Sequence, residues 1–403
     1  MRKLLYAFFI FGIFYFSLML LSCSAADSFE YEIEQDGAVT ITKYAGRDTV
    51  VAIPSELGGF PVRTIGAEAF LGCERITEVV IPEGIETIEM YAFEYCRALT
   101  QVELPQSVES IQYGAFKNCT SLREVELPER ADLYDSVFEN CTSLERVTLP
   151  AAAAQLPMET FKNCSSLKDV RLPADLRDIG HGAFSGCAKL ETIDLGKNIG
   201  MIDDYAFEGC TALRKISIQT AALTGIGTGA FAGCENMTQI KISTGNDRYF
   251  MRWGALYGCA SLTEVFLPEG LFDLGGSAFA ACTNLKKIWM PGGTCRMGGE
   301  LLAGCESFET MYVFDHSDAL SYAQQHDINY ILRALLPGDL DQDGDADGID
   351  AGLLLQSLAE WDVEIDFTAA DVNCDGEING VDIGLLLQYL AEWDIEWGKP
   401  ILC

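Results

Sequence analysis

The chain has 403 residues, of which 49% are hydrophobic, and a formal net charge of −33 at pH 7. This length and apolar content support more than one folded domain with a large core, which excludes a wholly disordered chain. The excess of 60 Asp and Glu over 27 Lys and Arg would repel nucleic acid, so divalent cations and neutral or basic partners fit better.

The N-terminus has the composition of a secretory signal. Arg2 and Lys3 precede an apolar run over residues 4–21. Small residues at 24–26 suit ordinary signal peptidase, so we expect a signal peptide over residues 1–26 and a secreted protein. The alternative is lipoprotein processing at Cys23, because residues 20–23 resemble a lipobox. No later segment has the roughly 20 apolar residues that span a bilayer, so no transmembrane anchor is expected in the mature protein.

A pattern of about 23 residues repeats along the middle of the chain. One copy, residues 99–119, reads Leu-x-x-Val-x-Leu-Pro and continues to Ile111, Ala115-Phe116 and Cys119. Each copy alone leaves half of its apolar surface exposed, so the copies must stack into a solenoid. The Val-x-Leu alternation predicts a short strand that the following Pro ends, and Ala-Phe-x-x-Cys is expected to return the chain along the opposite wall.

Eleven of the 15 cysteines occupy one position of this pattern, 22 to 25 residues apart. They are Cys73, Cys96, Cys119, Cys141, Cys164, Cys187, Cys210, Cys234, Cys259, Cys282 and Cys305. So many cysteines in an exported chain would ordinarily indicate disulfides. A fixed place in every copy instead favours small buried side chains with free thiols, and disulfides between neighbouring coils are the alternative.

Alternation along the predicted strands places the residue between Val and Leu of each copy on the outer face. These residues are Val80, Glu103, Glu126, Thr148, Arg171, Asp194, Ser217, Lys241, Phe266, Trp289 and Tyr312. The last three would form a contiguous aromatic stripe, because adjacent strands lie about 4.8 Å apart. We interpret this stripe as a ligand or partner surface. The alternative is that the rings only stack on one another and on the end of the solenoid.

A thin basic line precedes the stripe on the same face. It consists of Arg146, Arg171, Lys215 and Lys241. In a repeat protein such a line is usually an ordinary solvated face, and we expect no binding role for it.

The C-terminal region is strongly acidic, with 17 carboxylates and no Lys or Arg over residues 336–398. Two twelve-residue segments, 339–350 and 371–382, repeat each other after 32 residues. Oxygen-bearing side chains at positions 1, 3, 5, 9 and 12, a glycine at 6 and a carbonyl at 7 form the EF-hand arrangement for calcium. Without a cation these carboxylates would repel one another strongly, so a solvated acidic linker does not explain them.

We therefore expect two calcium ions, one in each loop. The expected ligands are Asp339, Asp341, Asp343, Asp345, Asp347 and Asp350 in the first loop, and Asp371, Asn373, Asp375, Glu377, Asn379 and Asp382 in the second. Position 12 is Asp rather than the Glu of a sensor EF-hand, and no amphipathic helix precedes either loop. A single helix is predicted after each loop, over residues 351–360 and 383–392.

The repeat pattern resembles the BspA-type leucine-rich repeats of bacterial surface proteins. Ile65-Gly66, Ala69-Phe70 and Cys73 open the regular array. The resemblance implies a solenoid of about 11 repeats with short parallel strands over residues 65–314. It also implies a leading cap over residues 27–64 and a closing cap with linker over 315–335. Such caps are needed because an end coil would otherwise expose a bare strand edge.

The duplicated loop-then-helix unit over residues 336–398 resembles a type I dockerin, the module by which cellulosomal proteins bind cohesin domains on a scaffoldin. The fold class expected for the whole chain is therefore a leucine-rich-repeat solenoid plus a small all-α dockerin. The two halves nearly coincide, so either could present the same surface to cohesin.

The resemblance also implies which residues contact cohesin, at loop positions 10 and 11 and on the helix that follows. They are Gly348, Ile349, Leu355 and Gln356 in the first half, and Gly380, Val381, Leu387 and Gln388 in the second. The family often has Ser-Thr at positions 10 and 11, whereas this chain has Gly-Ile and Gly-Val. That departure leaves the class of cohesin open and implies a more apolar contact.

No catalytic site is expected. The chain has three histidines, His181, His316 and His326, and none lies at metal-ligand spacing or near a nucleophile signature. We expect a secreted binding protein, held at the cell surface through a scaffoldin, whose repeats bind a protein or polysaccharide. The alternatives are that the repeats are a passive spacer, or that they contain an undetected hydrolase.

Overall fold

The computed structural model describes residues 28–244, 246, 248–314, 316–332, 351–355, 380, 383, 384 and 387. The chain divides into two compact units. Unit 1 comprises residues 1–196 and 203–213, and unit 2 comprises residues 197–202 and 214–403. The predicted signal peptide and all twelve predicted calcium ligands lie outside the described residues.

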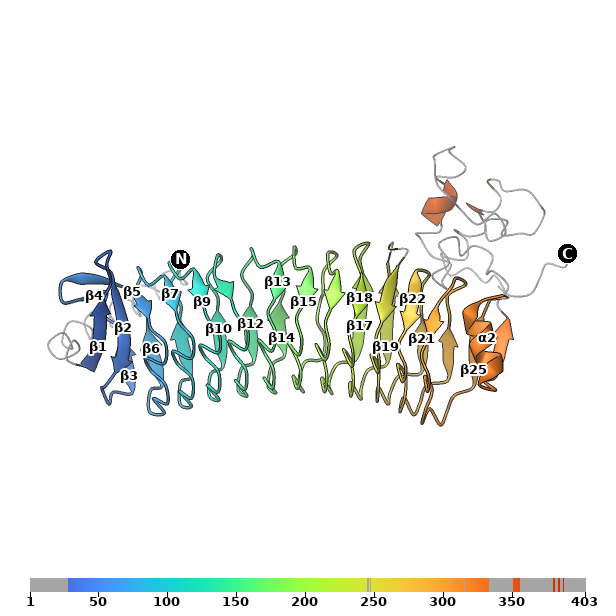
Figure 1. Cartoon of the computed structure of the whole chain (residues 1–403), viewed down its shortest axis with the longest axis horizontal. Coiled ribbons are helices and arrows are strands. Elements are labelled where there is room, and N and C mark those ends of the chain that lie inside the picture. Colours follow the sequence, from blue (N-terminus) through green and yellow to red (C-terminus); the bar gives the residue numbers. More distant parts are fainter. Residues whose placement is uncertain are drawn as a thin grey trace, which may run out of the picture. The chain divides into compact units, whose positions relative to one another are not determined.

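Unit 1 is a stack of coils with a row of short strands along each of two walls (Figure 1). Its strands are β1 (Phe29–Ile33), β2 (Val39–Tyr44), β3 (Val50–Ala52), β4 (Glu56–Leu57), β5 (Phe60–Ile65), β6 (Glu78–Val80), β7 (Thr87–Ile88), β8 (Gln101–Glu103), β9 (Ser110–Ile111), β10 (Glu124–Glu126), β11 (Asp132–Leu133), β12 (Arg146–Thr148), β13 (Gln155–Leu156), β14 (Asp169–Arg171) and β15 (Asp178–Ile179). One wall is the sheet β3-β6-β8-β10-β12-β14, and the other begins with β1-β2-β5-β7-β9-β11.

Unit 2 has the same construction. Its elements are β16 (Met201–Ile202), β17 (Lys215–Gln219), β18 (Gly225–Ile226), β19 (Gln239–Ser243), β20 (Tyr249–Met251), β21 (Glu264–Phe266), β22 (Leu271–Leu274), β23 (Lys287–Trp289), β24 (Arg296–Met297), β25 (Thr310–Val313), α2 (Asp318–Gln325) and β26 (Tyr330–Leu332). One wall is the parallel row β16-β18-β20-β22-β24. The other consists of two separate sheets, β17-β19 and β21-β23-β25-β26. The predicted solenoid of short parallel strands is thus confirmed in both units.

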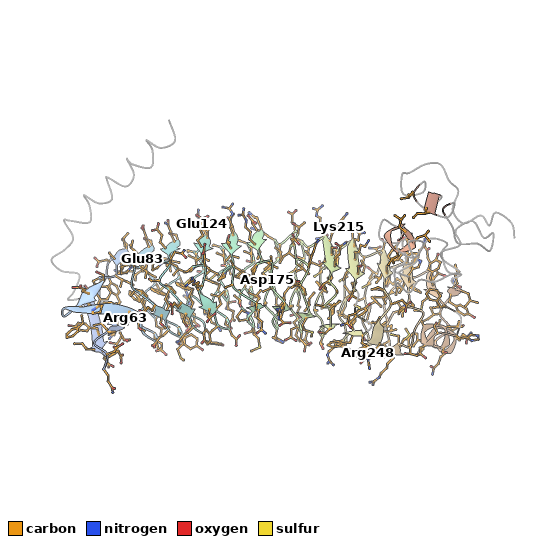
Figure 2. The ribbon with its side chains drawn as sticks, turned by 90° about the horizontal axis from the view of Figure 1, so that it is seen from above. Arg63, Glu83, Glu124, Asp175, Lys215 and Arg248 are labelled. Atoms are coloured by element: carbon orange, nitrogen blue, oxygen red, sulfur yellow. The ribbon has the colours of Figure 1, made fainter. Side chains whose placement is uncertain are left out.

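The predicted alternation of inward and outward side chains is also confirmed. In β10, Val125 is buried between exposed Glu124 and Glu126, and Figure 2 shows Glu124 pointing away from the ribbon. In β17, Ile216 and Ile218 are buried between exposed neighbours. The pleat of a strand imposes this arrangement because successive side chains leave opposite faces.

A column of stacked phenylalanines fills the core of unit 1. The repeat phenylalanine of each coil packs its ring directly against the ring of the next coil, and these rings are fully buried. Phe138 lies between Phe116 and Phe161, with ring centroids 5.6 and 5.8 Å apart and nearly parallel planes. Stacked rings at this spacing gain dispersion energy beyond the burial of their area. In unit 2 Leu256 takes the same place in its coil and is also fully buried.

The repeated cysteines line the same core with free thiols, as predicted. Nine of these thiols, from Cys96 to Cys305, donate to a main-chain carbonyl of the preceding coil. The Cys119 Sγ lies 3.2 Å from the Phe93 carbonyl oxygen, which also accepts from the Cys96 main-chain nitrogen. The thiol therefore donates the second of the two hydrogen bonds that this buried carbonyl oxygen can accept. Burial raises the pKa of Cys119 well above its ordinary value, which keeps the thiol protonated and unreactive.

The turns between the walls require left-handed backbone in every coil. Positive φ angles recur just before the Ala-Phe pair and just before the cysteine, at residues such as Tyr91 (57°) and Tyr95 (60°). Asparagine occupies the second position in three successive coils, and Asn140 Nδ2 donates to Asn118 Oδ1 over 2.9 Å. Asn tolerates left-handed backbone better than most residues, so this ladder satisfies both the backbone and the side chains.

Both ends of the repeats are covered. At the N-terminal side β1 pairs antiparallel with β2, and the rings of Phe29 and Tyr44 pack on Phe70 of the first regular coil. At the other end α2 buries Tyr322 and Ala323 against the last coil, and the Leu301 main-chain nitrogen donates to the Tyr322 hydroxyl. These segments close the apolar ends of the stack.

One predicted strand is absent. Asp194 was expected on an outer strand face, but residues 191–199 form no strand. The Asp194 carboxylate accepts from the main-chain nitrogen of Gly196, which has a φ of 71°. This local turn replaces the strand, although Ile193 and Leu195 remain buried.

Candidate functional site

The structure brings the three predicted aromatic residues of unit 2 together. Phe266 in β21, Trp289 in β23 and Tyr312 in β25 are in-register neighbours on parallel strands. The ring centroids of Phe266 and Trp289 lie 4.0 Å apart, and those of Trp289 and Tyr312 lie 4.7 Å apart. All three are partly exposed. We call these three residues the aromatic stripe.

The rings of the stripe turn their edges to solvent. The interplanar angles are 15° and 2°, so each ring covers a face of its neighbour. The edge of an aromatic ring carries partial positive charge and the face carries negative charge. The surface of the stripe therefore presents positive ring edges, which suit oxygen acceptors. The Lys287 Nζ lies 6.0 Å from the Trp289 ring centroid and adds a full positive charge there.

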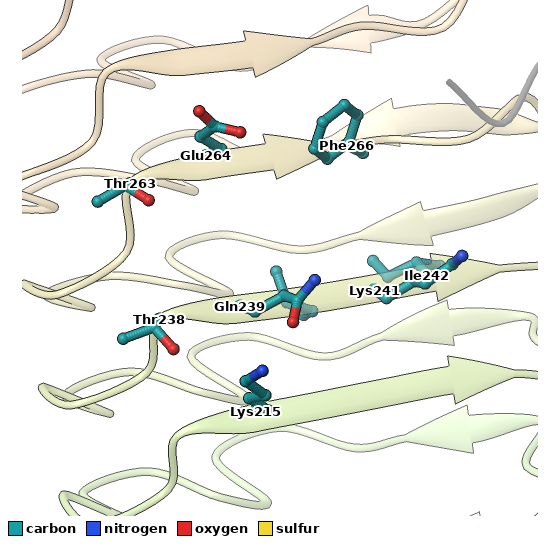
Figure 3. Close-up of a pocket in the computed structure, with 9 residues that line it drawn as sticks. Lys215, Thr238, Gln239, Lys241, Ile242, Thr263, Glu264 and Phe266 are labelled. Atoms are coloured by element: carbon teal, nitrogen blue, oxygen red, sulfur yellow. The ribbon is translucent and has the colours of Figure 1, made fainter. Parts of the chain in front are cut away.

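A groove of about 330 Å³ borders the stripe, and sequence reasoning did not predict it. Its lining comes from three consecutive coils, as Figure 3 shows. The lining residues are Lys215, Thr238, Gln239, Ile240, Lys241, Ile242, Thr263, Glu264 and Phe266. It therefore combines lysines, a carboxylate, hydroxyl and amide groups, and the first ring of the stripe.

The groove lies where the hydrogen-bond ladder of this wall is interrupted. β17 pairs with β19 over five residues, and β21 pairs with β23, but among the described residues no main-chain hydrogen bond joins β19 to β21. The coil that links them spans 25 residues from Cys234 to Cys259, two more than the next coil. The main-chain groups along the facing edges of β19 and β21 are therefore not used by each other.

The predicted basic line has two different environments. In unit 1 the Arg146 guanidinium lies 3.6 Å from Glu124 Oε2 and 3.3 Å from Asp169 Oδ2, both on adjacent strands. These are exposed ion pairs on a solvated face, as the sequence indicated. In unit 2, Lys215 and Lys241 line the groove instead.

A second set of exposed apolar side chains lies on the turns of unit 1 and was not predicted. It consists of Met90, Tyr95, Tyr113, Tyr134 and Met158, with Tyr91 half-buried beside them. The rings of Tyr91 and Tyr113 meet edge to face, with centroids 5.3 Å apart. These residues share no single position of the repeat: Met90, Tyr113 and Met158 stand three positions before the repeat phenylalanine, whereas the other three stand at different offsets.

The described part of the acidic C-terminal segment is helical, at residues 351–355, 380, 383, 384 and 387. Ala351, Leu354 and Ile383 are buried there, whereas the predicted cohesin contacts Leu355 and Leu387 are 53% and 49% exposed. Gly380, a third predicted contact, is also exposed. Gly348, Ile349, Gln356, Val381 and Gln388 lie outside the described residues.

The histidines occupy structural positions. His181 packs edge to face on Tyr205, and His326 ends α2 and stacks on Tyr322. Across the part of the chain that is described, no cluster of His, Cys, Asp or Glu has the geometry to hold a metal ion. Within the same residues, no helix combines the length and apolar character needed to cross a bilayer.

Comparison with family models identifies both parts of the chain. The BspA type leucine rich repeat region matches residues 59–157, 131–253 and 223–324, and the dockerin type I domain matches residues 337–391. Comparison with curated proteins gives no match.

Several solved structures are similar to the chain, all with TM-scores below 0.5. The T. pallidum leucine rich repeat protein is 29% identical, with a TM-score of 0.43 over 53% of this chain and 89% of that one. A leucine rich cell surface protein of Faecalibacterium prausnitzii is 24% identical, with a TM-score of 0.43 over 75% and 96%. A leucine-rich repeat protein of Eubacterium ventriosum is 21% identical, with a TM-score of 0.44 over 72% and 78%.

The two matched families fix the general character of the molecule. Both are non-catalytic interaction domains, and both are typical of extracellular or cell-surface proteins. Type I dockerin domains bind calcium and dock onto cohesins, and leucine-rich repeats bind other proteins. With its repeats matched over most of its length and its acidic end matched separately, the chain belongs to the BspA-type leucine-rich-repeat family and carries a C-terminal type I dockerin domain.

Proposed function

We propose that this is a secreted, non-catalytic binding protein that attaches through calcium-loaded loops to a cohesin of a scaffoldin, while its repeats bind a protein or polysaccharide. The dockerin match over residues 337–391 is the observation that carries the proposal. The loop spacing supports two calcium ions, held by the side chains at positions 1, 3, 5, 9 and 12 and by the carbonyl at position 7 of each loop. The signal-like residues 1–26 support secretion.

The exposure of two equivalent leucines supports the proposed docking surface. Leu355 and Leu387 lie 32 residues apart, at the same place in the two halves. About half of each side chain is exposed, while Leu354 beside the first is fully buried. An apolar side chain held outward next to a buried one suits a contact with a partner protein.

The aromatic stripe is the proposed ligand surface of the repeats. Three adjacent, partly exposed aromatic residues on strands form the kind of anchor that dominates binding energy at interfaces. Mutual stacking at 4.0 and 4.7 Å also fits the alternative that the stripe serves only stability. In that case the repeats would be a spacer and docking would be the only function. A hydrolase within the repeats has no observation in its favour.

Single and double substitutions of Leu355 and Leu387 by aspartate test the docking surface. With either half able to bind, Leu355→Asp alone and Leu387→Asp alone should each weaken binding to the cognate cohesin by less than about threefold, because the other half remains intact. The double variant should lose at least about 100-fold, since both copies of the surface then carry a desolvated charge. The measurement is calorimetric titration of the full chain against a panel of cohesins in calcium.

Ser357→Asp combined with Tyr389→Asp provides the matched control, because these residues also lie 32 apart on the two predicted helices. Binding by the control at wild-type strength is expected. A Leu355 and Leu387 double variant that still binds every cohesin as the wild type does would exclude this surface.

A further inference from the structure

The outer strand face of unit 2 has a different charge from that of unit 1. On β17, β19, β21, β23 and β25 the outward side chains include three lysines, Lys215, Lys241 and Lys287, and one carboxylate, Glu264. On β6, β8, β10, β12 and β14 five carboxylates face two arginines. In a protein of net charge −33, the face beside the aromatic stripe is thus locally positive. Local potential of this sign attracts an acidic partner.

Ring orientation argues against a polysaccharide as that partner. Sugars pack their C–H groups on the negative faces of aromatic rings, and a chain of sugars needs several faces in one plane. Here the faces are covered by mutual stacking, with interplanar angles of 15° and 2°. The exception is Phe266, whose ring borders the groove on the side away from Trp289. The site therefore offers one open ring face, which suits a single planar side chain.

The polar lining of the groove favours a peptide. Thr238, Gln239 and Thr263 line it and supply hydroxyl and amide groups that can donate hydrogen bonds to a peptide backbone and accept them from it.

Resting on the proposed function, in which the repeats bind a ligand at the aromatic stripe, we infer that the ligand is an acidic peptide segment that carries an aromatic residue. Its aromatic ring packs on the open face of Phe266 in the groove. Its carboxylates pair with Lys215 on one side and with Lys287 on the other, next to the positive ring edges of Trp289 and Tyr312. The lysines give attraction and orientation, and the buried ring gives affinity.

The test uses the full chain in excess calcium and three defined probes: a random copolymer of glutamate and tyrosine, polyglutamate, and polygalacturonate. At low ionic strength the copolymer should bind at least about tenfold more tightly than either of the others, because only it supplies both charge and a planar ring. Binding should weaken as salt is raised. Phe266→Ala should remove the preference for the copolymer over polyglutamate.

Charge reversal provides the matched variants. Lys215→Glu with Lys287→Glu should weaken copolymer binding at least about tenfold through like-charge repulsion. Arg171→Glu with Lys189→Glu makes the same change in charge on exposed positions of unit 1 and should change binding less than about twofold. Thermal unfolding checks that both double variants remain folded.

The inference would be overturned by no binding of the copolymer, by an equal loss in both double variants, or by tighter binding of polygalacturonate. The last would identify an acidic polysaccharide as the ligand. Cohesin binding is measured on the same preparations, so a failure at the groove is separated from a failure of docking. If Trp289→Ala lost copolymer binding while the Lys215 and Lys287 double variant kept it, the stripe would still be the ligand surface, but the inference that the ligand is acidic would be wrong.

Discussion

Replacing Asp339 and Asp371 together by alanine should abolish calcium-dependent binding to cohesin. These residues are position 1 of the two loops, and each loop needs its full set of oxygens to close around the ion. Under the proposed function the loops fold around the metal, so loss of the ion is expected to remove the helices that carry the contact residues as well. We expect affinity to fall at least about 100-fold, equivalent to roughly 2.7 kcal/mol, in surface plasmon resonance against immobilised cohesin.

Asp362→Ala with Asp366→Ala provides the control for this prediction. Both residues belong to the same acidic segment but lie between the two loops. This variant loses the same charge and should retain calcium-dependent binding. Undiminished cohesin affinity in the Asp339 and Asp371 variant would contradict the assignment of the loops as calcium sites.

Truncating one ring of the phenylalanine column should have the largest effect on stability. Phe138 is fully buried between two parallel rings, so Phe138→Ala removes contacts with both neighbouring coils and leaves a cavity. We expect a loss of about 3–5 kcal/mol in the free energy of unfolding, measured by urea denaturation. The stability of a solenoid depends on the contacts between adjacent coils, and these are the contacts that the substitution removes.

The chain itself suggests the control. Leu256 occupies the equivalent place in a coil of unit 2 and is fully buried there. Phe138→Leu should therefore cost much less, about 1–2 kcal/mol, because an aliphatic side chain refills most of the space. If Phe138→Ala were no more harmful than truncation of the exposed Tyr134, the ring column would not be the main source of stability.

The repeat made much of the fold predictable. A fixed period places Val125 inward, Glu124 outward and Cys119 in the core, because one coil determines the environment of the next. The prediction failed at Asp194, where a local turn through Gly196 replaces the strand. Side-chain competition of this kind depends on two residues of one coil and is not visible in the period.

The aromatic stripe was predictable in its residues but not in its geometry. Strand alternation brought Phe266, Trp289 and Tyr312 into one stripe. Whether the ring faces are covered depends on how each ring is rotated. Whether a groove opens beside Phe266 depends on the missing main-chain ladder between β19 and β21. Ring rotation and the missing ladder are both tertiary features. The only sign of the missing ladder in the sequence is the coil from Cys234 to Cys259, which is two residues longer than the coil after it. The proposed calcium loops, by contrast, rest on sequence spacing alone.

Calorimetric titration of calcium into the complete, calcium-stripped chain tests the docking assignment most directly, with circular dichroism recorded alongside. Two ions should bind per chain, helical signal should rise with them, and cohesin should bind only afterwards. A chain that takes up no calcium, or that binds cohesin equally well in excess chelator, would contradict it.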